Sequence, residues 1–249
     1  MRVLAVIPAR YASTRFPAKP LALLGGKPIV QRVYEAVAEV VERVVVATDD
    51  SRILDVVVAF GGEAIMTSSE HQSGTDRCAE AIEKLGCEAD IVINVQGDEP
   101  FIAREQIETL LKCFESKEVE IATLARPFRA EEGIEALENP NSPKVVINSK
   151  GEAVYFSRSI VPYLRDVERS EWLKHHTFYK HVGIYAFRAK TLGEVTRLPL
   201  SSLEKMERLE QLRWLESGYK IGVGITEVEN IGIDTPEDLQ RAESLLKGV

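Results

Sequence analysis

The chain has 249 residues, 45% of them hydrophobic and 28% charged, and its 31 basic against 39 acidic side chains give a formal net charge of −8. This composition is typical of a globular protein, and its acidic balance disfavours a general affinity for nucleic acid. The longest apolar runs fall far short of the roughly 20 residues that cross a bilayer. We therefore expect neither a membrane-spanning segment nor a secretory signal. The three cysteines lack Cys-x-x-Cys spacing, which indicates reduced thiols and a cytoplasmic location.

Predicted strands and helices alternate in the first half of the chain. Short apolar, β-branched runs predict buried strands, and apolar residues at helical spacing predict the helices between them. The expected strands are 3–7, 43–48, 63–66, 90–95 and 120–124, and the expected helices are 28–42, 51–60, 75–85 and 104–114. The alternation predicts an α/β fold with a mostly parallel, Rossmann-like sheet and helices on both faces.

The second half has short extended runs separated by polar loops. Its expected elements are extended runs at 144–148, 153–156 and 181–187, a helix at 203–217, a strand at 220–225 and a helix at 236–247. The extended runs predict an antiparallel excursion from the main sheet. Since neither a repeat nor a linker is found, we expect one domain over residues 1–249, with a smaller β-rich lobe at about 126–190.

The helix expected at 203–217 carries an apolar stripe of leucines that includes Met206. A stripe of this kind predicts a face packed against the core. Glu207, Glu210 and Gln211 lie off the stripe, so the pattern alone places them on a solvated face.

Charge is unevenly spread, because the first 34 residues hold six basic side chains and no acidic one. Arg10, Arg15 and Lys19 follow the first predicted strand, and the crevice at the carboxyl ends of parallel strands binds ligands. With the hydroxyls of Ser13 and Thr14, these cations suit a triphosphate; a solvated loop is the alternative. The loop lacks both the dinucleotide-binding and the Walker glycine patterns, which disfavours a Rossmann dehydrogenase and a P-loop kinase.

Two aspartates are candidate Mg²⁺ ligands. Asp98 follows the strand predicted at 90–95, so it reaches the same crevice, and the alternative is an ordinary Gly-Asp turn. Asp234 precedes Thr235 and Pro236, which are expected to begin the last helix; the alternative is an acid that interacts with the helix dipole. Two aspartates brought to one triphosphate from separate segments would form a metal clamp.

A polar turn opens the helix predicted at 75–85. Ser73, Gly74 and Thr75 could present N–H and hydroxyl groups to a base or ribose, with Arg77 one turn into the helix. The alternative is a helix cap with Arg77 paired to nearby acids.

Eight motifs occur in order along nearly the whole chain and together resemble the 3-deoxy-manno-octulosonate cytidylyltransferase family. They are IPARYASTRFPAKPL, VATDD, HQSGTDR, NVQGDEP, YFSRSIVP, HVGIYAF, LEQLRWLE and GIDTPEDL. The resemblance implies a nucleotidyltransferase fold and a homodimer formed partly through the middle lobe. It implies that CTP and 3-deoxy-D-manno-octulosonate (KDO) react with Mg²⁺ to give CMP-KDO and pyrophosphate, which activates KDO for lipopolysaccharide synthesis. In-line attack by the anomeric hydroxyl needs charge clamps and positioning, in agreement with the basic loop and the aspartates.

The resemblance also implies a role for individual residues. Arg10, Arg15 and Lys19 would hold the triphosphate, with Lys19 near the α-phosphate, and Asp98 and Asp234 would bind Mg²⁺; these five form the implied catalytic set. Cytidine would be recognised by Ala9, Ser73, Gly74 and Arg77. KDO would be held by Gln96, Arg158, His181, Tyr185, Glu210 and Gln211, with Arg158 facing the sugar carboxylate.

Two other functions stay open on the sequence. One is a catalytically silent nucleotide-binding module on the same fold, which the presence of all three loop cations and both aspartates disfavours. The other is a cytidylyltransferase for a different sugar acid, because Tyr185 and its neighbours suit either hydrophobic packing or several related sugars. Assaying KDO against sialic acid separates these alternatives.

Overall fold

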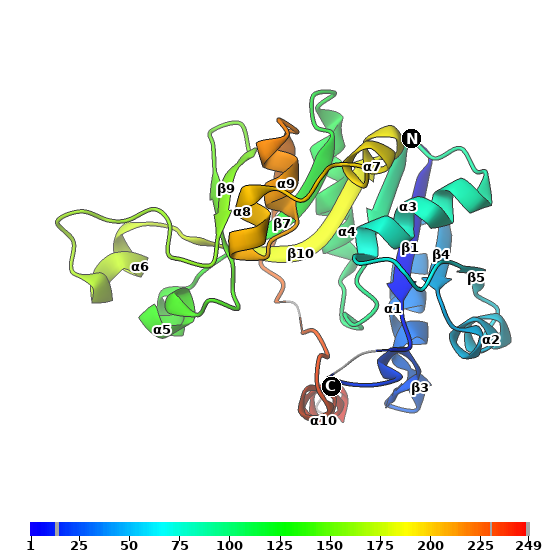
Figure 1. Ribbon diagram of the computed structural model, residues 1–249. Helices are drawn as coiled ribbons and strands as arrows, with labels where there is room; N and C mark the ends of the chain where they lie inside the picture. Colours follow the sequence, from blue (N-terminus) through cyan, green and yellow to red (C-terminus); the bar gives the residue numbers. More distant parts are fainter. Residues whose placement is uncertain (13–14, 230, 248–249) are drawn as a thin grey trace. The chain divides into compact units, whose positions relative to one another are not determined.

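The computed structural model describes residues 1–12, 15–229 and 231–247, and the chain divides into two compact units (Figure 1). Unit 1 contains Met1–Ile107, Phe187–Thr196 and the described part of Asn230–Val249, and unit 2 contains Glu108–Ala186 and Arg197–Glu229. Ser13 and Thr14, predicted to contact the nucleotide, lie outside the described residues. Across the described ranges, no helix combines the length and the apolar character needed to cross a membrane.

Unit 1 is built on a parallel sheet whose strands run in the order β6-β1-β4-β5. These strands are β1 (Val3–Ala9), β4 (Arg43–Thr48), β5 (Glu63–Met66) and β6 (Ile91–Asn94). The side chains of Ala5, Val6 and Ile7 are fully buried, which explains why a continuous apolar run forms the central strand. The parallel sheet predicted for the first half is confirmed.

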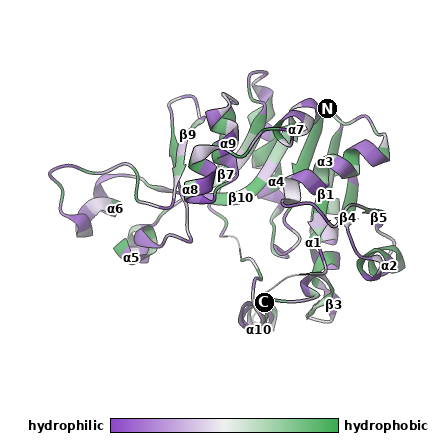
Figure 2. Ribbon diagram, in the orientation of Figure 1, coloured by the Kyte–Doolittle hydropathy of each residue, from purple (hydrophilic) through white to green (hydrophobic). Residues whose placement is uncertain are grey.

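Helices pack around this sheet. They are α1 (Ile29–Ala38), α2 (Ser51–Ala59), α3 (Gly74–Leu85) and α7 (Ala189–Val195). α10 (Pro236–Lys247) also belongs to unit 1, and α4 (Arg104–Lys112) contains the boundary between the units. Figure 1 shows α3 crossing in front of β1 and β4, which it contacts. In Figure 2 the strands are mostly hydrophobic and α3 presents hydrophilic residues outward, as expected for an amphipathic helix on a buried sheet.

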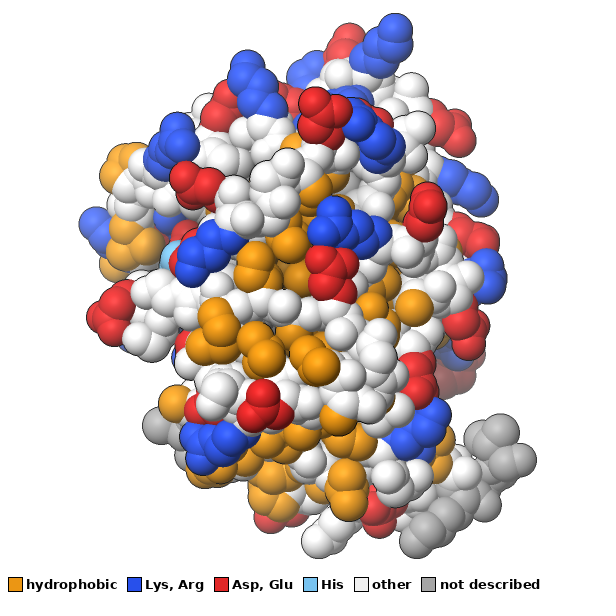
Figure 3. Space-filling view, turned by 90° about the vertical axis from the view of Figure 1, so that its right-hand side faces the viewer, with side chains coloured by type: hydrophobic (Ala, Val, Ile, Leu, Met, Phe, Trp, Pro, Cys, Tyr) orange, Lys and Arg blue, Asp and Glu red, His pale blue; other side chains and the backbone are white. Residues whose placement is uncertain are grey.

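The surface of unit 1 mixes charge with scattered apolar side chains. Figure 3 views the side on which α2 and β5 lie, and hydrophobic side chains there alternate with acidic and basic ones. Val58 of α2 and Met66 of β5 are among the exposed large hydrophobic residues. A short antiparallel pair, β2 (Leu23–Leu24) and β3 (Lys27–Pro28), precedes α1.

Unit 2 combines a parallel pair of strands with an antiparallel group. Its strands are β7 (Ile121–Pro127), β8 (Lys144–Ile147), β9 (Ala153–Ser157), β10 (Tyr179–Arg188, with its last two residues in unit 1) and β11 (Ile221–Ile225). β11 runs parallel to β7, whereas β8 pairs antiparallel with β9 and β10. The predicted antiparallel excursion is confirmed.

The helices of unit 2 are short. They are α5 (Gly133–Glu138), α6 (Trp172–His175), α8 (Ser202–Glu207) and α9 (Gln211–Glu216). A satellite core of Phe128, Leu137, Trp172 and Phe178 forms beneath α5 and α6. The sequence patterns did not predict α5, α6 or α7, because helices of four to seven residues contain too few turns to show periodicity.

The prediction of a single helix at 203–217 is wrong. The chain forms α8 and α9 instead, and Arg208 between them adopts a left-handed conformation with φ of 51°. The break rotates the two segments, so the side chain of Met206, expected in the core, is 78% exposed, whereas that of Gln211, expected in solvent, is buried. The helices expected to reach 42 and 114 end earlier, at Ala38 and Lys112.

Candidate active site

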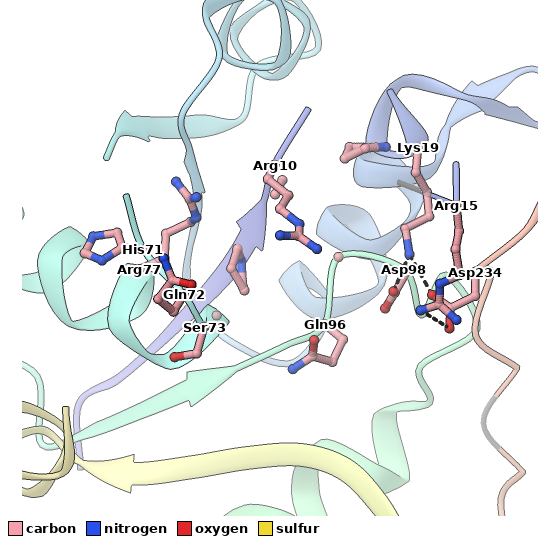
Figure 4. A pocket seen from close by; sticks show the side chains of 15 residues that line it. Arg10, Arg15, Lys19, His71, Gln72, Ser73, Arg77, Gln96, Asp98 and Asp234 are labelled. Carbon is pink, nitrogen blue, oxygen red and sulfur yellow. Dashed lines mark hydrogen bonds and ion pairs between the residues drawn. The ribbon is translucent and has the colours of Figure 1, made fainter. Parts of the chain in front are cut away.

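A pocket of about 330 Å³ lies in unit 1 at the carboxyl ends of β1 and β6 (Figure 4). It is lined by residues from the end of β1, the basic loop, the polar turn that opens α3, the turn after β6 and the segment before α10: Pro8, Ala9, Arg10, Arg15, Lys19, Pro20, His71, Gln72, Ser73, Gly74, Arg77, Gln96, Gly97, Asp98 and Asp234. In Figure 4, Lys19, Arg15 and the two aspartates gather at one end, while Ser73, Gln72 and Arg77 lie at the other. The pocket therefore has a charged end and a polar end.

Lys19 is the centre of the charged end. Its Nζ lies 2.5 Å from Asp98 Oδ2 and 3.1 Å from Asp234 Oδ1, and the Lys19 side chain is only 14% exposed. Arg15 Nη2 lies 3.1 Å from Asp234 Oδ2. These ion pairs join residues 79 and 215 positions apart in the sequence, so the predicted convergence of the basic loop with both aspartates is confirmed as geometry.

The basic loop is folded to aim Lys19 inward. Ala18 has a left-handed backbone with φ of 57°, and its N–H donates to the carbonyl of Tyr11 at 3.0 Å. A non-glycine residue in this conformation costs about 1 kcal/mol, which the surrounding contacts must offset. The reversal of direction at Ala18 places Lys19 at the start of a 3₁₀ turn with Pro20 buried behind it.

Asp98 reaches the pocket through a close backbone contact. A Cβ atom at Gly97 would lie 2.8 Å from the carbonyl oxygen of Pro8, so only glycine lets the turn after β6 lie against the end of β1. The carbonyl of Asp98 also accepts the N–H of Ile233 at 2.9 Å, which brings the segment before α10 alongside. Asp98 therefore belongs to a tight turn and also lines the pocket, while its role as an Mg²⁺ ligand stays a prediction.

Asp234 sits just outside the start of α10. The Thr235 hydroxyl accepts the Asp238 N–H at 3.2 Å, and the Asp238 carboxylate accepts the Thr235 N–H at 3.0 Å. This reciprocal cap confirms the structural role predicted for Thr235 and Asp238. It leaves the Asp234 carboxylate to Lys19 and Arg15.

The donor set at the charged end fits Mg²⁺. Asp98 and Asp234 supply two hard carboxylates, and Mg²⁺ in nucleotide sites is held by one or two carboxylates together with substrate phosphates. Within the described ranges, no cluster of three or more His, Cys, Asp or Glu side chains forms a self-sufficient metal cage. A cation at this position therefore depends on the nucleotide to complete its coordination.

The polar end begins at the first turn of α3. Ser73 and Asp76 form a capping box, in which the Ser73 Oγ accepts the Asp76 N–H at 3.1 Å and the Asp76 carboxylate accepts the Ser73 N–H at 3.2 Å. The cap alternative is thus correct for Ser73, and the residue still lines the pocket. Arg77 is buried and donates to Asp49 Oδ2 at 2.9 Å, so its predicted pairing with an acid is confirmed.

Glu80 of α3 binds the segment before Ser73 through Ser68 and His71. Its carboxylate accepts the Ser68 N–H at 2.7 Å and contacts His71 Nε2 and, at 2.7 Å, Lys84 Nζ. Burial acts to raise its pKa, but the hydrogen bonds from Lys84, Ser68 and His71 prevail and lower the pKa of Glu80 to about 2. The carboxylate is therefore charged at neutral pH and fixes His71 at the pocket wall.

The remaining pocket residues lie between the two ends. Arg10 is exposed and points into the space between them, and Gln96 follows β6 at the pocket edge (Figure 4). Ala9 ends β1 and lines the pocket, as predicted. All described residues predicted to contact the nucleotide therefore meet in one place.

The other predicted sugar-binding residues belong to unit 2. His181 and Tyr185 lie on β10 with ring centroids 5.5 Å apart, and Tyr185 meets Trp214 of α9 edge to face at 5.0 Å. Burial lowers the pKa of His181 to about 3, and burial together with the Glu210 carboxylate raises the pKa of Tyr185 well above 10. Both side chains are thus neutral across the physiological range.

The tautomer of His181 follows from its partner. The Thr123 hydroxyl lies 2.8 Å from the carbonyl oxygen of Ile184 and 3.0 Å from His181 Nε2. Because its one proton goes to the carbonyl, the hydroxyl accepts from Nε2–H, which leaves His181 Nδ1 as an acceptor. A neutral imidazole of this kind can accept a hydrogen bond from a sugar hydroxyl.

Arg158, Glu210 and Gln211 are placed around the break between α8 and α9. The guanidinium of Arg158 donates to the carbonyls of Glu207, Pro140 and Arg208 at 2.6, 2.8 and 3.3 Å. Glu210 pairs with Arg213 at 3.3 Å. Gln211 is buried, and its Nε2 finds no hydrogen-bond acceptor among the described residues. A buried amide without a partner is costly, so this nitrogen is available for a ligand.

Comparison with known proteins places the chain in a family. The cytidylyltransferase family model matches residues 4–221. The chain belongs to the cytidylyltransferase family. A cytidylyltransferase of Phocaeicola vulgatus named 3-deoxy-manno-octulosonate cytidylyltransferase is 61% identical over 247 residues, covering 99% of this chain and 98% of that protein. One of the same name from Thermodesulfovibrio yellowstonii is 50% identical over 254 residues, covering 99% and 98%.

A solved cytidylyltransferase structure, CMP:2-keto-3-deoxy-manno-octonic acid synthetase complexed with CTP, is also similar. It superposes with a TM-score of 0.91 at 42% identity, covering 100% of this chain and 99% of that one. A cytidylyltransferase of Leptospira borgpetersenii has a TM-score of 0.65 at 16% identity, covering 100% and 88%, which shows the shared fold alone. The α/β architecture predicted from the alternating strands and helices is confirmed.

Sequence reasoning missed several residues at the polar end. Asp49, which holds Arg77, and His71 and Glu80, which fix the wall of the pocket, were assigned no role. One pattern could have found Asp49, because it directly follows the strand at 43–48 and so lies at the same sheet edge as Asp98. No local pattern identifies Glu80, whose importance depends on a turn nine to twelve residues earlier.

Proposed function

We propose that this chain transfers CMP from CTP to the anomeric hydroxyl of KDO, releasing pyrophosphate and activating KDO for lipopolysaccharide synthesis. The family membership supports the cytidylyltransferase reaction, and the high identity to relatives named for KDO supports the acceptor. The observation that carries the proposal is the convergence of Lys19, Asp98 and Asp234 in one pocket at the carboxyl ends of β1 and β6.

The elongated pocket accounts for how CTP would lie. The triphosphate is assigned to the end with Arg15 and Lys19, and cytidine to the end with Ser73, Gly74 and Arg77. Arg10 lies between them and can reach phosphate oxygens from the side of the loop. The electrostatic field along the pocket therefore favours one orientation of the nucleotide.

We propose that Asp98 and Asp234 hold Mg²⁺ when CTP binds. The ion would supply neutralisation of the phosphate charge and polarise the α-phosphate. Lys19, held by the same two carboxylates, is positioned to donate to oxygens of the α-phosphate as their negative charge grows. Arg15 opposes the charge of the departing pyrophosphate, and no covalent enzyme intermediate is required.

His181, Tyr185 and Gln211 of unit 2 are assigned to KDO; Gln96, also predicted to hold the sugar, lines the nucleotide pocket of unit 1. The neutral His181 Nδ1 accepts from a hydroxyl, while Gln211 Nε2 donates to an oxygen. Arg158 retains N–H groups beyond the three carbonyls that it contacts, and these suit the sugar carboxylate. Glu210, whose charge acts on Tyr185, is assigned to accept from a sugar hydroxyl.

We further propose that the protein acts in the cytoplasm as a homodimer formed through the lobe near α5 and α6. The exposed ring of Tyr163 against Trp172 of that lobe supports the homodimer, and the reduced thiols of Cys78, Cys87 and Cys113, which form no disulfide among the described residues, support the cytoplasm. Light scattering at micromolar concentration tests it: a mass near 56 kDa, twice the 27.8 kDa of the chain, is expected, and a monomer at every concentration contradicts it.

The decisive experiment measures pyrophosphate release with CTP, Mg²⁺ and either KDO or sialic acid. Release is expected only with CTP, KDO and metal together, and not with ATP, with UTP or after addition of EDTA. Release with sialic acid instead keeps the nucleotide site but overturns the acceptor. Tight CTP binding by calorimetry without release under any condition supports a catalytically silent module.

A further inference from the structure

We propose that Asp49 is a positioning residue of the nucleotide site, which holds Arg77 and the basic loop in a fixed relation to each other. The inference rests on the proposed function, since it concerns how the same pocket binds CTP. Asp49 does not line the pocket and belongs to neither the metal pair nor the triphosphate set. It therefore acts through its neighbours and not on the substrate.

The first contact of Asp49 is with the guanidinium of Arg77. Asp49 follows the last residue of β4, and its Oδ2 accepts from Arg77 Nη2 at 2.9 Å. The two side chains are only 14% and 5% exposed, so water screens this ion pair poorly. The pair holds the charge of Arg77 at the pocket wall.

Arg77 also donates hydrogen bonds to two neutral oxygens. Arg77 Nη1 donates to Thr67 Oγ1 at 2.6 Å and to the carbonyl of Ser68 at 3.1 Å. Thr67 is itself tied to the end of β4, because its N–H and its hydroxyl both donate to the carbonyl of Thr48, at 2.7 and 3.1 Å. Three fixed acceptors thus define the plane of the guanidinium, and Asp49 is the charged one among them.

The second contact of Asp49 reaches the basic loop. Its Oδ1 accepts the N–H of Tyr11 at 3.4 Å, and the carbonyl of Tyr11 accepts the N–H of Ala18, the residue before Lys19. The ring of Tyr11 is covered by the guanidinium of Arg52, 3.4 Å from its centroid. One residue, Tyr11, therefore links the Asp49 carboxylate to the backbone that positions Lys19.

Through these two contacts, Asp49 affects how the pocket binds its substrate. Arg77 lies at the polar end of the pocket and Lys19 at the charged end, and one carboxylate restrains both. Loss of this restraint lets the two ends shift relative to each other. Nucleotide affinity and the distinction between cytosine and uracil then suffer first, whereas the sugar site is unaffected.

Asp49→Asn tests the assignment, because the amide is uncharged and keeps one acceptor oxygen for two donors, Arg77 Nη2 and the Tyr11 N–H. Steady-state kinetics with CTP, UTP and KDO should show the KM for CTP raised about tenfold, with kcat changed less than about threefold. The preference for CTP over UTP should fall about fivefold, and the KM for KDO should stay within about twofold. A purely structural role would leave the CTP preference unchanged, and that result overturns the proposal.

Glu63→Gln is the matched control. Glu63 and Arg43 form a carboxylate–guanidinium pair at 2.7 and 3.0 Å between the starts of β5 and β4, the end of the sheet away from the pocket. This variant should leave the KM for CTP and the CTP preference unaltered. Equal kinetic effects in Asp49→Asn and Glu63→Gln would show that any lost ion pair in this sheet suffices, against the proposal.

A double-mutant cycle with Arg77→Lys shows whether Asp49 acts through Arg77. In that background, Asp49→Asn should weaken CTP binding, measured by calorimetry, by less than about threefold; additive losses contradict the mechanism. If Asp49→Asn does not fold, Asp49→Glu keeps the charge and should show the same CTP-specific pattern at smaller size, and wild-type values there count against the proposal. Wild-type protein that binds CTP but releases no pyrophosphate with KDO refutes the proposed function alone, since the CTP-binding cycle still tests Asp49.

Discussion

The nucleotide pocket of unit 1 depends on charged side chains, whereas the candidate sugar site of unit 2 contains the neutral side chains of His181 and Tyr185. In unit 1, Lys19, Asp98 and Asp234 are charged, partly exposed and carried on loops at strand ends. In unit 2, His181 and Tyr185 are held neutral by burial on a strand and packed against aromatic rings. A polyanion needs the first arrangement, whereas a hydroxyl-rich sugar is better recognised by the second.

The comparison teaches where each kind of site is vulnerable. Removing a charge from the unit 1 cluster leaves an opposite charge unbalanced at the reacting centre, so turnover suffers most. Altering a neutral group in unit 2 removes one hydrogen bond, which contributes about 1 kcal/mol. Variants in the two units should therefore differ by orders of magnitude in their effect on turnover.

The largest effect is expected at the metal pair. If the two aspartates hold Mg²⁺ as proposed, Asp98→Asn and Asp234→Asn should each lower kcat by about 10²–10³-fold, because an amide would not supply the negative charge that holds the ion against the triphosphate. Pyrophosphate release at saturating CTP and KDO measures this loss, and thermal unfolding should confirm that both variants stay folded. Wild-type turnover in both variants with saturating Mg²⁺ would remove the metal assignment.

Lys19→Met comes next and keeps the length of the side chain without its charge. We expect kcat to fall about 10²-fold, since the growing charge on the α-phosphate loses a buried donor. The variant also leaves Asp98 and Asp234 facing each other without Lys19, so half-saturation by Mg²⁺ should shift to lower metal concentration in a CTP-binding titration. Unchanged kcat with a weaker KM for CTP would instead make Lys19 a ground-state contact.

His181→Gln tests the neutral site of unit 2. The KM for KDO should rise about tenfold, with the KM for CTP unaltered, because one hydrogen-bond acceptor is lost. If the KM for CTP rises equally, the residue does not serve the sugar. Thr123→Val should reproduce a smaller part of the KDO effect, since it frees the imidazole tautomer.

His181 also makes stability depend on pH. Its pKa of about 3 in the folded protein lies below the value near 6.5 that it has when unfolded, so the unfolded state binds the extra proton. Stability is therefore constant above pH 6.5 and falls as the pH drops from 6.5 toward 3. Urea unfolding should show that this slope is shallower in His181→Gln, and identical slopes would contradict a buried neutral imidazole.

The smallest effect is expected from Glu80→Gln, which changes the support of the pocket wall. The pKa of about 2 lies below the unfolded value, so the carboxylate stabilises the fold above about pH 4.5 and loses this effect as the pH falls toward 2. The variant should lose about 1 kcal/mol at pH 7 and approach the wild type only near pH 2. Glu83→Gln, exposed on the same helix, is the control and should show no pH-dependent difference.

Prediction from sequence succeeded where local pattern and fold geometry coincide. Buried strands in a parallel sheet are continuous apolar runs, so β4 and β5 were predicted with the bounds that the structure has. The carboxyl ends of β1 and β6 lie at one edge of the same parallel sheet, which is why Lys19 and Asp98 were expected to meet. The N-terminal cap of α10 was likewise predicted correctly from Thr235, Pro236 and Asp238.

Prediction failed where long-range contacts decide the local structure. The chain breaks at Arg208 although 203–217 has a continuous apolar stripe, because the carbonyls of Glu207 and Arg208 are contacted by the distant Arg158. The burial of Gln211 follows from that break. Asp49 and Glu80 act through partners distant in sequence, and periodicity carries no information about such pairs.

The hydrogen bond between the Ile233 N–H and the Asp98 carbonyl brings Asp234 to a pocket made mostly by the first hundred residues, and this has a consequence for biosynthesis. Lys19 is made early and finds Asp98 within the first half of the chain, but its other partner, Asp234, emerges from the ribosome 215 residues later. A nascent chain can thus assemble the sheet of unit 1, and even the polar end of its pocket, while the charged end is still missing a carboxylate. Competence to use CTP is acquired only after Asp234 has emerged, so chains terminated before this residue do not consume nucleotide.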